Sequence, residues 1–218
     1  MVLLAGAPGV GKTLSAGVLS NELGLSLFAV DLSRVVSKWI GETETNLGKL
    51  FAAAEAEGCA LLFDEADSLF GQRAAARTAS DRYANMEVNY LLNRIERFTG
   101  LVFLTTNQPE AIDPAMHRRF AMHIMIPLPD QAERAELWHR MVHAGCAPLA
   151  ADIDVADLAR RFPDMSGANI RNAVLNALYL AASEDGNIQH VHLVRGGKAE
   201  YHAMGKVAAR AARPRLEN

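Results

Sequence analysis

The sequence predicts an α/β protein, in which a parallel five-stranded sheet flanked by helices is followed by a small all-helical domain. Segments with helical spacing of apolar residues alternate with short apolar segments that suit buried strands, at residues 2–4, 26–30, 59–64, 101–106 and 122–126. Pro127 and Pro129 end this alternation, and the pattern beyond them is helical. We therefore expect two domains, at residues 1–128 and 129–218.

Helices are predicted in the first domain where apolar residues recur every three or four positions. One follows the first strand and ends near residues 21–24, with apolar positions at Leu14, Val18, Leu19 and Leu23. A second covers residues 43–57, and a third covers residues 81–98. Because these helices alternate with apolar strands, the strands are expected to run parallel, with helices on both faces of the sheet.

The second domain is predicted to contain helices at residues 130–144, 154–161 and 166–183. Asp130 and Glu133 have the spacing of a capping box, which marks the start of the first of these helices. The tail after Gly205 is basic and rich in alanine, and it is either a further helix or a frayed end.

Composition argues against several classes of protein. A formal net charge of −3 over 218 residues gives no reason to expect binding to nucleic acid or to an anionic membrane. No apolar run approaches the length that spans a bilayer. Cys59 and Cys146 are too few for a disulfide framework, and the apolar setting of Cys59 predicts a buried thiol. These features favour a cytoplasmic protein.

A glycine-rich loop lies between the first predicted strand and the first predicted helix. It fits the spacing G-x-x-x-x-G-K-[ST] and comprises Gly6, Ala7, Pro8, Gly9, Val10, Gly11, Lys12 and Thr13. The glycines let backbone N–H groups point inward at a phosphate, and the helix N-terminus behind them favours negative charge. Lys12 is expected to reach the terminal phosphates of a nucleoside triphosphate, and Thr13 to offer its hydroxyl to Mg²⁺. A chance match is the competing interpretation.

Polar residues end two of the predicted strands. Asp64 and Glu65 end the third strand, and Asn107 ends the fourth. Because ligands bind at the carboxyl ends of parallel strands, these residues are expected beside the phosphate loop. Asp64 could hold Mg²⁺, Glu65 could orient or deprotonate a water, and Asn107 could position that water or contact the γ-phosphate. The alternatives are a solvated strand end and a loop-capping asparagine.

Two further segments allow a functional or a structural interpretation. Arg118 and Arg119 precede the fifth predicted strand, and they are either a surface pair or arginines that reach the γ-phosphate of a neighbouring subunit. The other segment comprises Lys38, Trp39, Ile40 and Gly41. In it, two large apolar residues follow a lysine, and a polar run comes after the glycine. It is either a strand end in the core or an exposed loop that grips a substrate.

In this order, the motifs resemble those of the AAA ATPase module (ATPases associated with diverse activities), which has a P-loop NTPase fold with a helical lid domain. The resemblance covers nearly the whole chain. It implies a Walker A motif at Gly6 to Thr13, a Walker B motif at Asp64 and Glu65, and sensor 1 at Asn107. It also implies arginine fingers at Arg118 and Arg119 and a central-pore loop at Lys38 to Gly41.

The resemblance also implies an activity and partners. Members of the family hydrolyse ATP to ADP and phosphate with Mg²⁺, and they form ring hexamers that thread or remodel proteins. Within the family, the residues of these motifs are most similar to those of bacterial AAA proteins, some of which are encoded beside contractile injection machines. We therefore expect a ring homo-oligomer, a hexamer, that acts on a protein substrate or partner.

The second domain carries a segment, residues 165–174, that is similar to the AAA lid helix. In that family the backbone at Gly167 and Ala168 would lie near the adenine base, and Arg171 would be either a sensor 2 arginine or a helix-surface arginine. AAA modules also carry a segment ahead of the Walker A strand that helps hold the adenine. We therefore expect the natural protein to have further residues ahead of Met1.

Several functions stay open on the sequence alone. The first is an ATP-driven motor that remodels or threads a protein, and the second is an ATP-gated assembly scaffold or regulator of a larger machine, such as a contractile injection system. Trp39 distinguishes the two, because only a motor needs it in a pore. A small-molecule kinase is disfavoured, because Glu65 and Asn107 suit activation of water. A transition metal is not expected at His139 and His143.

Overall fold

The computed structural model describes the chain at residues 1–30, 42–67, 89–112, 114–144, 148–184 and 186–206. These residues form two compact units, which are described separately. One unit comprises Met1–Ala7 and Gly11–Ile126, and the other comprises Pro8–Val10 and Pro127–Asn218.

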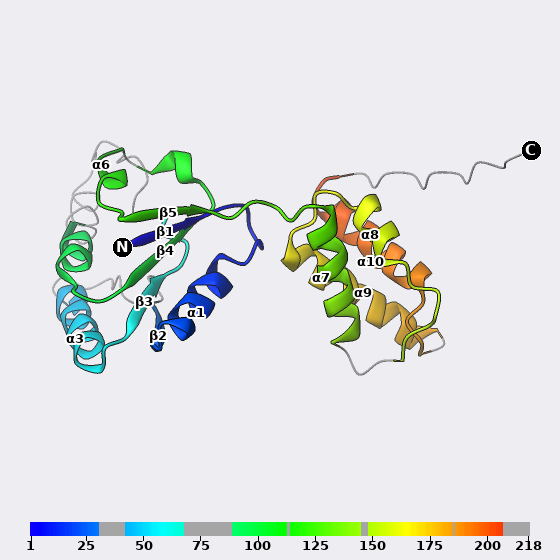
Figure 1. Cartoon of the computed structure of the whole chain (residues 1–218), viewed down its shortest axis with the longest axis horizontal. Helices are drawn as coiled ribbons and strands as arrows, with labels where there is room; N and C mark the ends of the chain where they lie inside the picture. Colours follow the sequence, from blue (N-terminus) through cyan, green and yellow to red (C-terminus); the bar gives the residue numbers. More distant parts are fainter. Residues whose placement is uncertain (31–41, 68–88, 113, 145–147, 185, 207–218) are drawn as a thin grey trace, which may run out of the picture. The chain divides into compact units, whose positions relative to one another are not determined.

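A parallel sheet of five strands forms the centre of the first unit, in the order β2-β3-β4-β1-β5 (Figure 1). The strands are β1 (Val2–Ala5), β2 (Leu27–Val30), β3 (Ala60–Phe63), β4 (Val102–Thr106) and β5 (Met122–Met125). Each coincides with one of the five apolar segments, so the predicted fold class is confirmed. The interior strands β3 and β4 are buried along their whole length, as expected for continuous apolar runs.

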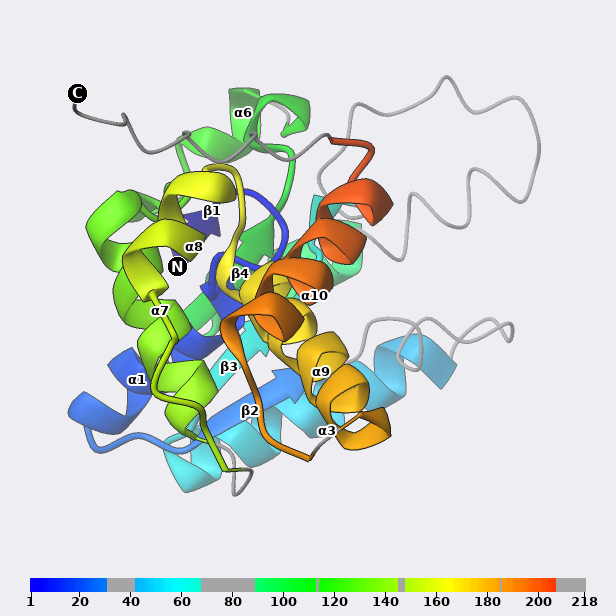
Figure 2. The same cartoon turned by 90° about the vertical axis from the view of Figure 1, so that its right-hand side faces the viewer.

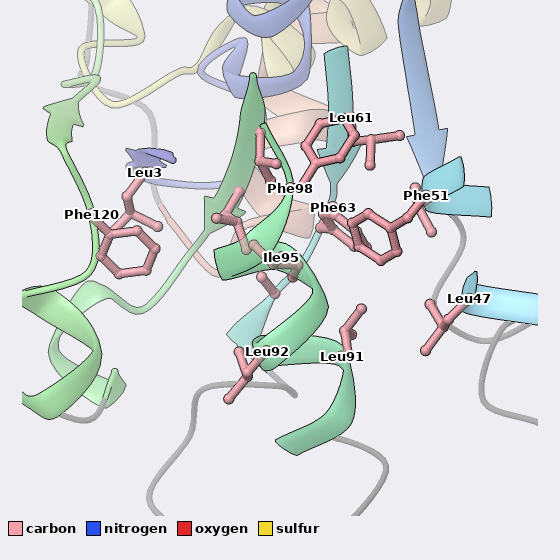
Figure 3. Close-up of a cluster of buried hydrophobic side chains, with 14 of the residues drawn as sticks. Leu3, Leu47, Phe51, Leu61, Phe63, Leu91, Leu92, Ile95, Phe98 and Phe120 are labelled. Carbon is pink, nitrogen blue, oxygen red and sulfur yellow. The ribbon is translucent and has the colours of Figure 1, made fainter. Parts of the chain in front are cut away.

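Helices cover both faces of the sheet. The described helices are α1 (Lys12–Glu22), α3 (Glu42–Glu57), a helix at residues 89–97, the short 3₁₀ helix η1 (Pro109–Ala111) and α6 (Pro114–His117). Successive strand residues point to opposite faces. One face packs against α3 and the helix at residues 89–97, in a cluster that includes Phe51, Phe63 and Ile95 (Figure 3). The other face packs against α1, where Ala16 belongs to one buried cluster with Leu4, Leu62 and Phe103.

Helix α1 forms where predicted, but its predicted apolar face is not buried. Leu14, Val18 and Leu23 are exposed, whereas Ala16 and Ser20 are buried. The helix starts directly behind the glycine loop, and this connection fixes which side of it meets the sheet. Small side chains on that side let the helix lie close to the strands.

The second unit contains α7 (Gln131–His143), α8 (Val155–Arg161), α9 (Gly167–Ser183) and α10 (His190–Ala203). The first three agree with the predicted helices, and the Asp130–Glu133 capping box is present at α7. Their core surrounds Trp138, Phe162 and Tyr201. None of the helices in the described part of the chain is long and apolar enough to cross a membrane.

Helix α10 is not among the helices that the sequence predicts, and its interior contains two successive glycines, Gly196 and Gly197, which are unfavourable there. The structure gives them a packing role. A methyl group at Gly196 would overlap the carbonyl oxygen of Ala173 in α9, and one at Gly197 would overlap the ring of Phe162. The glycines therefore allow α10 to lie against α9, and the two helices are side by side in both views (Figure 1 and Figure 2).

Candidate active site

The glycine loop joins the end of β1 to the start of α1, as its spacing predicts. Gly9 and Gly11 have φ values of 78° and 100°, a conformation that side chains other than glycine rarely adopt. Gly11 is the N-cap of α1, so the first turn of the helix directly follows the loop. Backbone N–H groups and the positive end of the helix dipole favour an anion at this place.

Lys12 links the loop to the end of β4. Its ammonium donates to the carbonyl oxygens of Gly6 and Ala7 at 2.9 and 3.0 Å, and to Asn107 Oδ1 at 2.6 Å. Burial lowers the pKa of Lys12, while the nearby carboxylates of Asp64, Asp67 and Glu65 act in the opposite direction. The structure therefore brings two of the predicted site residues, Lys12 and Asn107, into direct contact.

Thr13 and Asp64 also meet, although 51 positions separate them in the sequence. The hydroxyl of Thr13 donates to Asp64 Oδ2 at 2.9 Å. A hydroxyl and a carboxylate oxygen are both ligands that Mg²⁺ accepts, and a magnesium ion in such a site keeps several of its waters. The residues present therefore fit the predicted ion, with Thr13 and Asp64 as the residues that would hold it.

Glu65 lies at the first turn beyond β3 and has an exposed side chain. It has a φ of 52°, and no other non-glycine residue among those described has a positive φ. Its backbone N–H donates to Thr105 Oγ1 at 3.0 Å, and the next N–H, of Ala66, donates to the Thr105 carbonyl oxygen at 2.9 Å. The end of β4 thus fixes the turn that carries Glu65.

Sequence reasoning missed three residues that organise this region, namely Thr105, Thr106 and Asp67. The Thr105 hydroxyl donates to Asp64 Oδ1, and the Thr106 hydroxyl donates to Asp67 Oδ1. Asp67 Oδ2 also accepts the backbone N–H of Asn107 at 3.2 Å. The available signal was the pair of threonines in an otherwise apolar strand, because buried hydroxyls need hydrogen-bond partners.

Arg118 and Arg119 lie away from the phosphate loop of their own chain. They precede the start of β5, which pairs in parallel with β1, so that Met122 is opposite Val2 and Met125 is opposite Ala5. The loop follows the other end of β1. Arg119 forms an ion pair with Glu96, whereas Arg118 is exposed and has no hydrogen bond or ion pair with the described residues.

Of the other predicted site residues, Ala168 contacts the glycine loop, because its backbone N–H donates to the carbonyl oxygen of Gly9 at 3.2 Å. Lys38, Trp39, Ile40 and Gly41 lie outside the described residues. Gly167 and Ala168 form the first turn of α9, where Ser166 is the N-cap, and the side chain of Arg171 is exposed. Residues 8–10 of the glycine loop belong to the same compact unit as α9, and a role of Gly167, Ala168 and Arg171 in binding a nucleotide stays a prediction.

A glycine loop between a strand and a helix, with carboxylates at the end of a neighbouring parallel strand, defines a P-loop protein that binds nucleoside triphosphates. Residues 2–128 match the family described as the ATPase family associated with various cellular activities (AAA). The chain belongs to this family and carries an AAA ATPase module.

Curated relatives are similar over most of the chain. It is 34% identical over 198 residues to the ATP-dependent zinc metalloprotease FtsH of Hahella chejuensis. The matched region covers 88% of this chain and 31% of that FtsH. It is 35% identical over 190 residues to the Cell division cycle protein 48 homolog of Archaeoglobus fulgidus, with 84% and 25% covered. It is 32% identical over 191 residues to the 26S proteasome subunit RPT4 of Saccharomyces cerevisiae, with 84% and 43% covered. The chain thus spans less than half the length of each of these relatives.

Proposed function

We propose that this module binds ATP with Mg²⁺, hydrolyses it within a ring oligomer, and couples hydrolysis to the remodelling of a protein. The observation that carries the proposal is one hydrogen-bonded cluster. Lys12 contacts Asn107, Thr13 contacts Asp64, and Glu65 is held beside Asp64 at the end of β3. The cluster brings a lysine, a hydroxyl and two carboxylates to the same edge of the sheet, and this arrangement supports the proposed roles.

Each residue has a separate task in this proposal. The loop N–H groups and Lys12 bind the phosphates, and Thr13 and Asp64 hold Mg²⁺, which neutralises charge on the phosphate oxygens. Glu65 takes a proton from the attacking water, since its side chain is exposed and the end of β4 holds the turn that carries it. Asn107 offers a neutral amide to the water or to the γ-phosphate. In the helical unit, Gly167, Ala168 and Arg171 are candidates for contacts to the adenine and the phosphates.

The ring follows from Arg118 and Arg119. These residues lie at the edge of the sheet opposite their own phosphate loop. An arginine that stabilises the transferred γ-phosphoryl group must therefore come from a neighbouring subunit. Closed symmetry with the same contact repeated gives a ring, and we propose a hexamer.

Two observations support a protein as the substrate, one from the relatives and one from this chain. The names of relatives include a metalloprotease and a proteasome subunit, so similar modules occur in proteins that act on proteins. Within this chain, Lys38, Trp39, Ile40 and Gly41 combine a cation with large apolar side chains, which suits a loop that grips a polypeptide without sequence preference. A scaffold that only assembles when ATP is bound is the alternative, and it has no need for Trp39.

Lys12→Met tests the nucleotide site. Methionine keeps a flexible apolar stem but removes the charge, and a hydrogen bond to a charged group contributes up to about 3 kcal/mol, or ~150-fold in Kd. We expect a loss of this size in the affinity for a fluorescent ATP analogue, measured by titration. Lys49→Met, at an exposed position of α3, is the matched control and should bind as the wild type does. Wild-type affinity in Lys12→Met would refute the assignment.

Trp39→Ala separates the motor from the scaffold. If Trp39 grips a substrate, the variant should keep its melting temperature and basal ATP hydrolysis but fail to unfold a tagged fluorescent reporter protein. If Trp39 is a core residue, the variant should lose roughly 3–5 kcal/mol of stability. Trp138→Ala shows the size of that loss, because Trp138 is fully buried in the helical unit. Reporter unfolding at the wild-type rate by Trp39→Ala would contradict threading.

A further inference from the structure

Thr105 occupies the point where the end of β4 meets the turn that follows β3. We propose that Thr105 is a positioning residue for ATP hydrolysis, whose buried hydroxyl holds Asp64 and Glu65 in their working arrangement. The inference rests on the proposed function, in which Asp64 holds Mg²⁺ and Glu65 is the base. It adds a residue that neither binds the phosphates nor reacts.

The hydroxyl of Thr105 uses both of its hydrogen-bonding capacities on the two acids. Its Oγ1 donates to Asp64 Oδ1 and accepts the backbone N–H of Glu65 at 3.0 Å. The side chain is only 1% exposed, so water cannot replace these contacts. A third bond, from the Ala66 N–H to the Thr105 carbonyl oxygen at 2.9 Å, fastens the same turn through the backbone.

For Glu65, the bond supports an unfavourable backbone conformation. A φ of 52° places a glutamate in the left-handed region, where a non-glycine residue stays only if its surroundings fix it. The N–H of Glu65 is anchored by the Thr105 hydroxyl, and no backbone carbonyl of the described residues accepts it. Without that hydroxyl, the turn is free to relax, and the Glu65 carboxylate moves with it.

For Asp64, the bond decides how the carboxylate is turned. Thr105 occupies Oδ1, while Oδ2 faces the hydroxyl of Thr13 at 2.9 Å. Each oxygen therefore has one partner, and the oxygen toward Thr13 is the one available to a metal shared with that residue. Thr105 fixes this orientation from the buried side of the carboxylate.

Thr106, the next residue, has a different task. Its hydroxyl donates to Asp67 and accepts the Gln108 N–H at 2.9 Å, so it organises the loop that carries Asn107. The two threonines point to opposite faces of the strand. The contacts to Asp64 and Glu65 therefore belong to Thr105.

The test compares Thr105→Val with Thr105→Ser. Valine keeps the shape of threonine and makes neither bond, whereas serine keeps the hydroxyl and makes both. We expect kcat for ATP hydrolysis to fall about ten- to a hundredfold in Thr105→Val, as displaced reacting groups do, with ATP affinity within about twofold of wild type. More Mg²⁺ should be needed for half-maximal activity. Thr105→Ser should restore both properties.

Thermal melts of Thr105→Val and the activity of Glu65→Gln distinguish a positioning role of Thr105 from a purely structural one. If Thr105→Val lowers the melting temperature while kcat and the Mg²⁺ dependence stay at wild-type values, Thr105 is structural and the inference is wrong. If Thr105→Val does not fold at the assay temperature, Thr105→Ala carries the same expectations. An inactive Glu65→Gln beside a fully active Thr105→Val overturns only the role of Thr105. A fully active Glu65→Gln overturns the role of Glu65 as the base in the proposed function.

Discussion

Glu65→Gln should bind ATP as the wild type does and release phosphate at least about a hundredfold more slowly, since a positioned general base contributes roughly 10²- to 10⁴-fold in rate. Glutamine matches glutamate in length and shape, but its amide cannot take a proton from water. The bonds that hold the turn involve the backbone N–H groups of residues 65 and 66, which the substitution leaves in place. Asp64 remains paired with Thr13 and Thr105. The change is therefore confined to the chemistry of one carboxylate.

Steady-state phosphate release and nucleotide titration together measure this effect. Glu55→Gln, at an exposed position of α3, makes the same chemical change on the surface and should hydrolyse ATP at the wild-type rate. A fall in rate accompanied by a matching loss of ATP affinity would point to disturbed binding. Unchanged turnover in Glu65→Gln would show that another group accepts the proton.

The sheet could be predicted from sequence because its signals are local. Each strand is a run of four or five mainly apolar residues, and the polar residues that end β3 and β4 must fall at the carboxyl edge of a parallel sheet. That topological rule predicts from the sequence that Lys12, Asp64 and Asn107 lie at the same edge of the sheet. In the structure Lys12 contacts Asn107, and Asp64 contacts Thr13, the residue next to Lys12.

The remaining features depend on tertiary contacts that no short window of sequence contains. Gly196 and Gly197 weaken the helical pattern of α10, and their packing against α9 and Phe162 exists only in the folded unit. The apolar positions of α1 are exposed, and the small residues Ala16 and Ser20 are buried instead. The role of Thr105 arises from a bond to a residue 41 positions away.

Arg118→Ala should reduce ATP hydrolysis by about a thousandfold or more, the amount that an arginine finger contributes. The expected mechanism is action in trans, because Arg118 precedes the start of β5 while the phosphate loop follows the far end of the adjacent strand β1. The two arginines differ in their surroundings. Arg118 is exposed and has no ion pair among the described residues, whereas Arg119 is paired with Glu96. Arg118 is therefore the freer cation to offer to a neighbour.

Mixing two inactive variants tests action in trans directly. At an ATP concentration that fills the wild-type site but not the weakened one, an Arg118→Ala subunit holds ATP, whereas a Lys12→Met subunit stays empty and keeps its arginines. In a random 1:1 mixture, half of the subunits hold ATP and half of their neighbours supply an arginine, so activity should return to about a quarter of the wild-type value. Activity per subunit of the wild type should also rise with protein concentration, because the site is complete only when subunits touch.

Arg140→Ala provides the matched control for the loss of a surface arginine. Arg140 is exposed and paired with Glu136 on α7, as Arg119 is with Glu96, and exposed ion pairs of this kind contribute about 0–1 kcal/mol to stability. Its removal should leave hydrolysis unchanged, and Arg119→Ala should remain folded in the same melting assay. If mixing restores no activity and the rate per subunit is constant over a wide concentration range, Arg118 does not act on a neighbouring site. The case for a ring in which each subunit completes the next would then fail, while the roles of Lys12 and Glu65 within one chain would stand.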